Sequence, residues 1–169
     1  MKDIPILFSQ EEIANRVLAL GKEINRDYAG KTNILVLSIL KGSFIFTADL
    51  VRYLNFSLDL EFMEISSYRN GSVQGELLSG KLPCDVQGKN ILIVEDIIDT
   101  GKSAQFLISL LQKSGVASIG MVALLIKPDK HILTMPVPYR GFEIGDQFVV
   151  GYGMDYNGKF RNLPYIGVV

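Results

Sequence analysis

The chain has 169 residues, of which 48% are apolar and 21% charged, and its formal net charge is −1 at pH 7. This length suits one globular domain with a sizeable core, and the balanced charge excludes the basic surface of a general nucleic-acid-binding protein. No stretch approaches the roughly 18 apolar residues that cross a bilayer, and a single cysteine, Cys84, excludes an internal disulfide framework. We therefore expect one domain over residues 1–169, located in the cytoplasm.

The first half of the chain alternates helical and extended patterns. Apolar spacing predicts, in chain order, a helix at 11–28, a strand at 33–40, a helix at 44–53 and a strand at 58–65. Ser9 and Glu12 have the spacing of a capping box, which marks the start of the first helix. Glycines and polar residues over 66–80 indicate a loop or a flexible hairpin.

The second half continues the alternation. Apolar runs predict strands at 91–94, 119–126 and 147–150, and a helix at 104–115. Strands that alternate with helices favour an α/β fold, and uninterrupted apolar strands favour burial on both faces. The expected architecture is a mainly parallel, doubly wound sheet flanked by helices.

The segment Ile91–Ser103 carries the strongest functional signal. Its apolar strand runs into Glu95-Asp96 and then into a hydroxyl-rich turn at residues 99–103. In open α/β sheets ligands bind at the carboxyl ends of strands, and helix N-termini present N–H donors to anions. We interpret the turn as a phosphate cradle beside two carboxylates. A nucleoside-triphosphate P-loop is excluded, because position 96 would have to be glycine. An ordinary capped strand–helix turn is the alternative, but consecutive acids near a core need a cation or hydroxyl partners.

This segment resembles the phosphoribosyl pyrophosphate (PRPP) motif of type I phosphoribosyltransferases, and most closely that of the hypoxanthine and hypoxanthine-guanine members. Other counterparts follow in the same order over essentially the whole chain: residues 40–43, 67–68, 127–128, 148–156 and 161–167. The resemblance implies a small hood formed by the chain ends. It also implies purine salvage, in which the 5-phosphoribosyl group passes from PRPP to hypoxanthine, and to guanine, with release of pyrophosphate.

The resemblance further implies the residues that bind PRPP and Mg²⁺. The turn from Asp99 would hold the ribose 5-phosphate, and Asp99 would also act as the general base at the purine imidazole. Glu95 and Asp96 would reach the ribose hydroxyls and, together with Asp155, hold Mg²⁺. The full PRPP-binding set is Lys41, Gly42, Glu95, Asp96, Asp99, Thr100, Gly101, Lys102, Ser103 and Arg161. By the same match, the Leu40–Lys41 peptide bond is expected to be cis.

The implied purine-binding residues are Lys127, Phe148, Val149 and Asp155. A lysine ammonium has donors and no acceptor, so Lys127 suits the carbonyl at position 6 of the purine. Phe148 would stack on the ring, and Val149 would read its edge through main-chain groups. Ser67 and Tyr68 match a mobile loop that closes over the substrates.

Each of these residues also has an ordinary explanation when taken alone. Lys127 is then a solvated lysine at a strand end, Phe148 a core residue, Arg161 a surface charge, and 66–80 a disordered hairpin. The functional alternatives are a relative selective for xanthine or guanine, a regulatory protein that keeps the PRPP fold, and a passive nucleotide-binding module. The expected partners are PRPP and a 6-oxopurine, without nucleic acid or membrane, in a homodimer or homotetramer.

Overall fold

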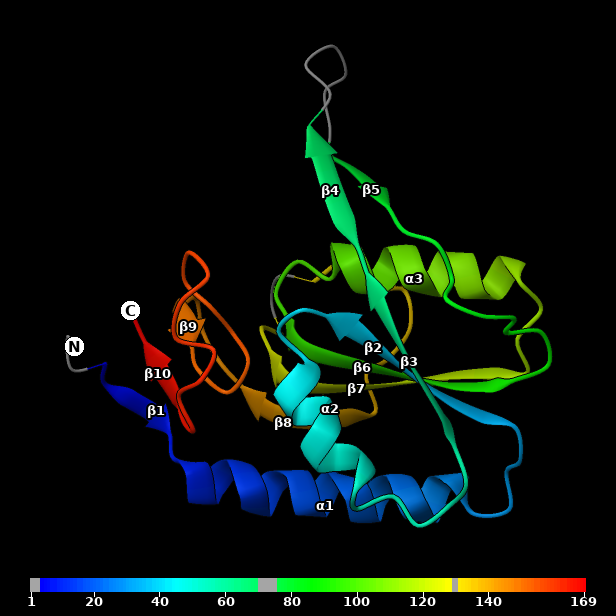
Figure 1. Ribbon diagram of the computed structural model, residues 1–169, viewed down its shortest axis with the longest axis horizontal. Coiled ribbons are helices and arrows are strands. Elements are labelled where there is room, and N and C mark those ends of the chain that lie inside the picture. The colour runs from blue at the N-terminus through cyan, green and yellow to red at the C-terminus, as the bar shows by residue number, and fades with distance from the viewer. Residues whose placement is uncertain (1–3, 70–75, 129–130) are drawn as a thin grey trace.

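A central five-stranded parallel sheet organises the computed structural model, which describes residues 4–69, 76–128 and 131–169 (Figure 1). The strand order is β3-β2-β6-β7-β8, and every neighbouring pair is parallel. The strands are β2 (Ile34–Leu40), β3 (Asp59–Glu64), β6 (Asn90–Ile98), β7 (Ser118–Ile126) and β8 (Tyr139–Glu143). The predicted parallel α/β sheet is therefore confirmed.

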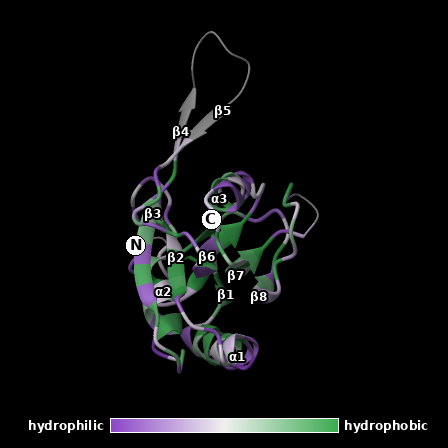
Figure 2. Ribbon diagram, turned by 90° about the vertical axis from the view of Figure 1, so that its right-hand side faces the viewer, coloured by the Kyte–Doolittle hydropathy of each residue, from purple (hydrophilic) through white to green (hydrophobic). Residues whose placement is uncertain are grey.

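Helices cover both faces of this sheet (Figure 1). The helices α1 (Gln10–Tyr28) and α2 (Phe44–Val51) pack on one face, and α3 (Lys102–Lys113) packs on the other. Alternate strand residues serve the two faces, because successive side chains of a strand point in opposite directions. In β6, for example, Leu92 joins the α1 and α2 cluster and Ile91 joins the α3 cluster. Figure 2 shows the mainly hydrophobic sheet between α1 and α3.

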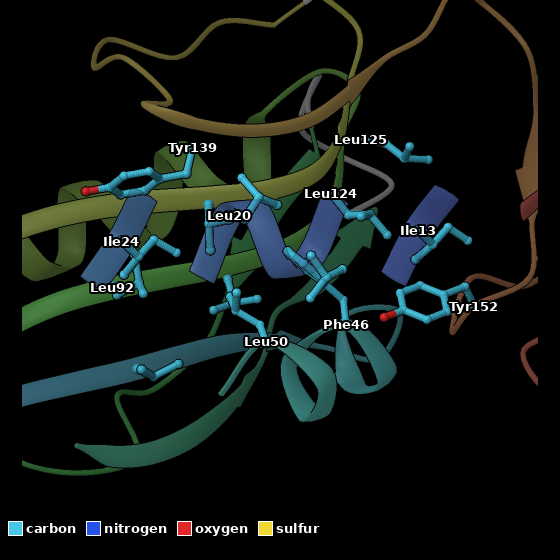
Figure 3. Packing of buried hydrophobic residues seen from close by; sticks show 14 of the residues in the cluster. Ile13, Leu20, Ile24, Phe46, Leu50, Leu92, Leu124, Leu125, Tyr139 and Tyr152 are labelled. Atoms are coloured by element: carbon cyan, nitrogen blue, oxygen red, sulfur yellow. The ribbon is translucent and has the colours of Figure 1, made fainter. Parts of the chain in front are cut away.

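The α1 cluster forms the larger apolar core, seen from close by in Figure 3. Ile13, Leu20 and Ile24 of α1 face Phe46 and other buried residues of α2 and the sheet. The predicted capping box is present at the start of α1. Its two hydrogen bonds satisfy backbone donors that the first helical turn leaves unpaired.

The connections that follow the adjacent parallel strands β2 and β6 lead in opposite directions. The chain leaves β2 toward α2 on one face, and it leaves β6 toward α3 on the other. Such a switch point opens a crevice at the carboxyl ends of two adjacent strands, where open α/β sheets bind ligands. The Lys41-Gly42 turn and the Asp99 turn both lie at this edge.

Two smaller sheets project from the central one (Figure 1). The hood is the antiparallel sheet of β1 (Ile6–Phe8), β10 (Ile166–Val168) and β9 (Val149–Val150), so both chain ends build it, as predicted. The strands β4 (Ser66–Arg69) and β5 (Glu76–Ser79) form an antiparallel hairpin. Residues 70–75, which fall between these strands in the sequence, lie outside the described residues.

The structure corrects some predicted boundaries. The strand β6 does not end at Val94, because its pairing with β7 continues to Ile98. The acidic pair therefore lies within the strand. Strands β1, β8 and β10 were not predicted, because each has only three to five residues and no long apolar run. Among the described residues, no helix has the length and apolar character needed to span a membrane.

Candidate active site

A cavity of about 290 Å³ lies where the carboxyl ends of the sheet meet the hood. Most of the predicted site residues line it, although they come from distant parts of the chain. Its lining consists of Lys41, Gly42, Asp96, Ile97, Asp99, Lys127, Gln147, Phe148, Val149, Met154, Asp155 and Arg161. The fold thus brings all four predicted purine-binding residues and half of the predicted PRPP-binding residues to one cavity.

The predicted phosphate turn closes β6 and begins α3. Gly101 is the residue before the helix and has a φ of 73°, a conformation that costs glycine little. Behind the turn, the Ile132 N–H donates to the Thr100 carbonyl at 3.0 Å. A Cβ on Gly101 would lie only 3.0 Å from Leu133 Cγ, so this segment packs closely against the turn. The arrangement places a helix N-terminus, with its N–H donors and partial positive charge, at the predicted phosphate position.

The two adjacent acids of β6 have different environments. Glu95 is only 7% exposed, and its buried Oε2 has no hydrogen-bond partner. Burial, and then the charge of Asp96, raise the pKa of Glu95 well above its usual value. Burial also raises the pKa of Asp96 to about 6, although backbone N–H groups and Arg161 oppose that shift. Burial thus disfavours the charged form of both carboxyl groups, which suits a site that receives a cation or hydroxyl groups.

The Lys41-Gly42 turn lies directly against Asp96. A Cβ at Gly42 would lie 1.7 Å from Asp96 Oδ2, so only glycine fits at this position without a shift. The Leu40–Lys41 peptide bond is cis, as predicted. The Lys41 Nζ lies 3.7 Å from Glu64 Oε1 at the end of β3, and both side chains are more than half exposed.

Three buried hydroxyl groups lie beside this turn. Ser38 Oγ is 2.6 Å from Ser43 Oγ and 2.7 Å from Thr47 Oγ1, and all three residues are fully buried. They link the end of β2 to the start of α2 and satisfy one another in an otherwise apolar core. This cluster was not predicted from the sequence.

Lys127 and Asp99 form an ion pair at the cavity. Lys127 Nζ lies 3.3 Å from Asp99 Oδ2, although the two residues come from the ends of β7 and β6. The Lys127 N–H also donates to the Ile98 carbonyl at 2.9 Å. Lys127 is only 8% exposed, so it is not the solvated lysine of the alternative explanation.

The opposite wall consists of the hood strand β9 and residues that adjoin it within 148–161. This stretch, together with the hood strands, is the hood region, and it forms the hood side of the cavity. The Phe148 side chain is 53% exposed, and its ring meets that of Tyr156 edge to face at 5.6 Å, so it is not a core residue. Arg161 Nη2 lies 2.5 Å from Asp155 Oδ1, and Arg161 Nη1 donates to the Gly153 carbonyl at 2.7 Å. Arg161 is therefore fixed at the cavity, and it is not a free surface charge.

Comparison with known proteins identifies the family. The model of the phosphoribosyl transferase domain matches residues 6–157. The chain belongs to the phosphoribosyltransferase family.

Named members of this family cover nearly the whole chain. The hypoxanthine-guanine phosphoribosyltransferase of Bacillus subtilis strain 168 is 43% identical over 166 residues, which are 97% of this chain and 92% of the relative. The hypoxanthine phosphoribosyltransferase of Haemophilus influenzae is 41% identical over 170 residues, 98% of this chain and 95% of the relative. A crystal structure of a hypoxanthine phosphoribosyltransferase from Staphylococcus aureus superposes with a TM-score of 0.89 at 38% identity, covering 99% of this chain and 92% of that one.

Several predicted phosphoribosyltransferase site residues lie outside the cavity lining. Glu95 is buried behind it, and the turn residues 100–103 lie at the start of α3. Ser67 and Tyr68 lie on β4, where they pair with Leu78 and Leu77. Their assignment to a closing loop stays a prediction.

Other residues of the site were not predicted from the sequence. Ile97, Gln147 and Met154 line the cavity, and their types alone give no functional signal. Gly153 contacts the predicted pyrophosphate turn, because a Cβ there would lie 2.2 Å from the Gly42 carbonyl oxygen. The repeated glycines of Gly151-Tyr152-Gly153 could have indicated a close backbone approach.

The carboxylates fit a Mg²⁺ ion that is held partly by substrate. Within the described residues, no group of three or more His, Cys, Asp or Glu side chains is placed to hold a metal. Magnesium usually keeps several waters and takes one or two carboxylates together with substrate phosphates. The unpartnered Glu95 Oε2 and the raised pKa of Asp96 mark oxygen donors that a cation would satisfy.

Proposed function

We propose that the protein transfers the 5-phosphoribosyl group from PRPP to hypoxanthine and guanine, forming IMP or GMP and pyrophosphate. The observation that carries this proposal is the Lys127–Asp99 pair. The Lys127 ammonium, a hydrogen-bond donor, lies 3.3 Å from the Asp99 carboxylate, and both residues line the same cavity as the exposed Phe148 ring. The names of the relatives support the same reaction class.

Recognition of the base would depend on Lys127 and Phe148. Lys127 offers only donors, so it matches a carbonyl at position 6 and leaves the amino group of adenine without an acceptor. The Phe148 ring lies at the cavity with more than half of its surface exposed, which leaves a face for stacking. Val149, the first residue of β9, would read the purine edge through its main-chain groups.

In the proposed reaction, a nitrogen of the purine imidazole bonds to the anomeric carbon of the ribose as the bond to the pyrophosphate oxygen breaks. Asp99 accepts the imidazole proton, which is the work of a general base. Lys41 and Arg161 lie at the same cavity and would stabilise the negative charge of the leaving pyrophosphate. The start of α3 would hold the 5-phosphate through residues 99–103.

Glu95, Asp96 and Asp155 would hold Mg²⁺ together with bound water and the oxygens of PRPP, because no three acids among the described residues are placed to ligate a metal by themselves. When bound, the ion supplies positive charge that offsets the charge of the pyrophosphate. The protein residues orient the ribose and keep the donor in line with the base.

Self-association into a homodimer or homotetramer is part of the same proposal. Phe44 of α2 and Phe62 of β3 are each 42% exposed, although both are large apolar residues. Large apolar side chains that stay exposed in one copy suit an interface between copies of the chain. Light scattering on the purified protein tests this part separately.

The deciding experiment mixes the protein with PRPP, Mg²⁺ and one purine at a time, and follows nucleotide formation. We expect product from hypoxanthine and guanine and none from adenine. The Lys127→Gln variant should raise the hypoxanthine KM with little change in the PRPP KM, whereas Lys22→Gln on the exposed side of α1 should change neither. Equal use of adenine, or no product with any base, would contradict the proposal.

A further inference from the structure

We propose that Tyr152, through its hydrogen bond to Asp49, is a positioning residue that fixes the hood and Arg161 at the pyrophosphate end of the cavity. The inference rests on the proposed function, because it assigns Arg161 and the Lys41-Gly42 turn to PRPP. Tyr152 does not line the cavity itself. Its effect on the reaction must therefore pass through its neighbours.

The hydrogen bond joins the hood region to α2. The Tyr152 hydroxyl donates to Asp49 Oδ2 at 2.6 Å, and the Tyr152 side chain is only 6% exposed. Asp49 also pairs with Arg52, the C-cap residue of the same helix. Because α2 begins at Phe44, directly after the Lys41-Gly42 turn, the bond attaches the hood region to the helix that follows this turn.

The backbone around Tyr152 transmits this attachment to the site. Gly151, Tyr152 and Gly153 have consecutive positive φ values of 97°, 49° and 102°, so the chain turns sharply here. The φ of Tyr152 is unusual for a residue with a large side chain, and such a conformation persists only where surrounding contacts hold it. The 2.6 Å hydrogen bond to Asp49 is one such contact.

Gly153 connects Tyr152 to the charged groups of the cavity. Its N–H donates to the Arg161 carbonyl at 3.0 Å, and its carbonyl accepts from Arg161 Nη1 at 2.7 Å. A Cβ at Gly153 would lie 2.2 Å from the Gly42 oxygen, so its backbone also contacts the pyrophosphate turn. A shift of Tyr152 would therefore move both Arg161 and the contact with Gly42.

Apolar packing alone does not fill the space around the bond. A second cavity of about 430 Å³ lies between α1, α2 and the chain near Tyr152, and both Asp49 and Tyr152 border it. Figure 3 shows the Tyr152 side chain at one end of the apolar cluster, with its hydroxyl turned toward Phe46. The hydrogen bond to Asp49 therefore holds the Tyr152 side chain in one position, which the incomplete packing around it would not do alone.

The molecule contains a matched control for this bond. The Tyr139 hydroxyl donates to Asp27 Oδ2 at 3.1 Å, and Tyr139 is also 6% exposed. This second tyrosine–aspartate pair joins β8 to α1 at the other end of the same cluster and does not line the active-site cavity (Figure 3). Loss of either hydroxyl should reduce stability alike, but only loss of the Tyr152 hydroxyl should affect PRPP.

The kinetic test compares Tyr152→Phe with Tyr139→Phe. Because a hydrogen bond to a charged group stabilises the position of its donor, Tyr152→Phe should raise the PRPP KM about three- to tenfold. The hypoxanthine KM, measured at saturating PRPP, should not change. Tyr139→Phe should leave both constants unchanged. Asp49→Ala should reproduce Tyr152→Phe, whereas Asp49→Asn keeps an acceptor oxygen and should largely retain PRPP affinity.

Hydrogen exchange tests the positioning without any substrate. We expect faster amide exchange over residues 151–161 in Tyr152→Phe than in Tyr139→Phe at equal thermal stability. The inference is overturned if the two variants exchange alike, or if an active Tyr152→Phe enzyme keeps the PRPP KM of Tyr139→Phe. Absence of nucleotide formation by the unmodified protein would contradict the proposed function instead, and the exchange comparison would still decide the inference.

Discussion

The central sheet and the hood are stabilised in different ways, although both line the same cavity. In the sheet, β2 and β7 are almost wholly buried and are fixed by continuous strand pairing and apolar packing on both faces. The hood strands have only two or three residues, and three non-glycine residues with positive φ lie in the adjoining stretch 152–160. Hydrogen bonds, ion pairs and glycine contacts therefore determine geometry on the hood side, whereas apolar burial determines it in the sheet.

The two regions also contribute different chemistry. The sheet ends supply Asp96, Asp99 and Lys127, and the hood side supplies Phe148 and Arg161. Under the proposed function, the sheet side carries proton transfer and base selection. The hood side carries stacking and the charge of the leaving group. Substitutions on the two sides should consequently differ in whether they reduce kcat or substrate affinity.

The largest effect is expected from Asp99→Asn at the sheet side. The amide keeps the shape of the side chain but cannot accept the imidazole proton, so kcat should fall by roughly 10²- to 10⁴-fold. PRPP affinity, measured by calorimetry, should change little, because the helix start and the other turn residues remain. Equal losses in turnover and PRPP affinity would assign Asp99 a binding role instead.

The next largest effect is expected from Gly153→Ala, where the hood side meets the pyrophosphate turn. The new Cβ would collide with the Gly42 carbonyl, and alanine is strained at a φ of 102°. We expect a loss of about 2 kcal/mol or more in the free energy of unfolding, together with a raised PRPP KM.

Gly30→Ala provides the control for backbone strain. Gly30 has a φ of 77° at the end of α1, with nothing within 4 Å of an added Cβ. It should lose about 1 kcal/mol of stability through strain alone and keep normal kinetics. If Gly153→Ala is as stable as Gly30→Ala and has the same PRPP KM, the contact between Gly153 and Gly42 is unimportant.

The sheet was predictable from the sequence for the same reason that it is stable. Burial on both faces requires uninterrupted apolar runs, and such runs mark β2, β6 and β7 directly. Of the hood strands, only β9 follows from an apolar run, at 147–150, whereas β1 and β10 are too short to leave a pattern and the hood itself was expected from the family resemblance. Contacts such as Lys127–Asp99 depend on how distant strand ends meet, and no local pattern encodes them. The roles of individual site residues stay proposals.

A smaller effect is expected in the pH dependence of stability. It arises from Asp96, a residue of β6 that lines the cavity between the sheet and the hood. Burial raises its pKa in the folded state to about 6, above its ordinary value of 3.8. The folded protein then binds more protons than the unfolded one between these values, so stability falls as the pH rises. In Asp96→Asn, the decline in the free energy of unfolding from pH 5 to pH 7 should shrink by about 1 kcal/mol.

The measurement is thermal or urea unfolding in the presence of a chelator, which keeps metal binding out of the comparison. Glu95 shifts in the same direction and is present in both proteins, so a residual decline is expected in the variant. Identical slopes for Asp96→Asn and the unmodified protein would show that Asp96 titrates normally.

The smallest effect is expected from Glu64→Gln at the edge of the sheet. Lys41 Nζ and Glu64 Oε1 are 3.7 Å apart, and both side chains are more than half exposed, so solvent screens their attraction. Such pairs contribute about 0–1 kcal/mol, and the lower end of that range is expected here. The PRPP KM should also stay within about twofold of normal, because the buried Ser38, Ser43 and Thr47 hydroxyls link β2 to the start of α2 and so hold both ends of the Lys41-Gly42 turn. A large rise in the PRPP KM of Glu64→Gln would show that this exposed pair, rather than the buried hydroxyl cluster, positions the turn.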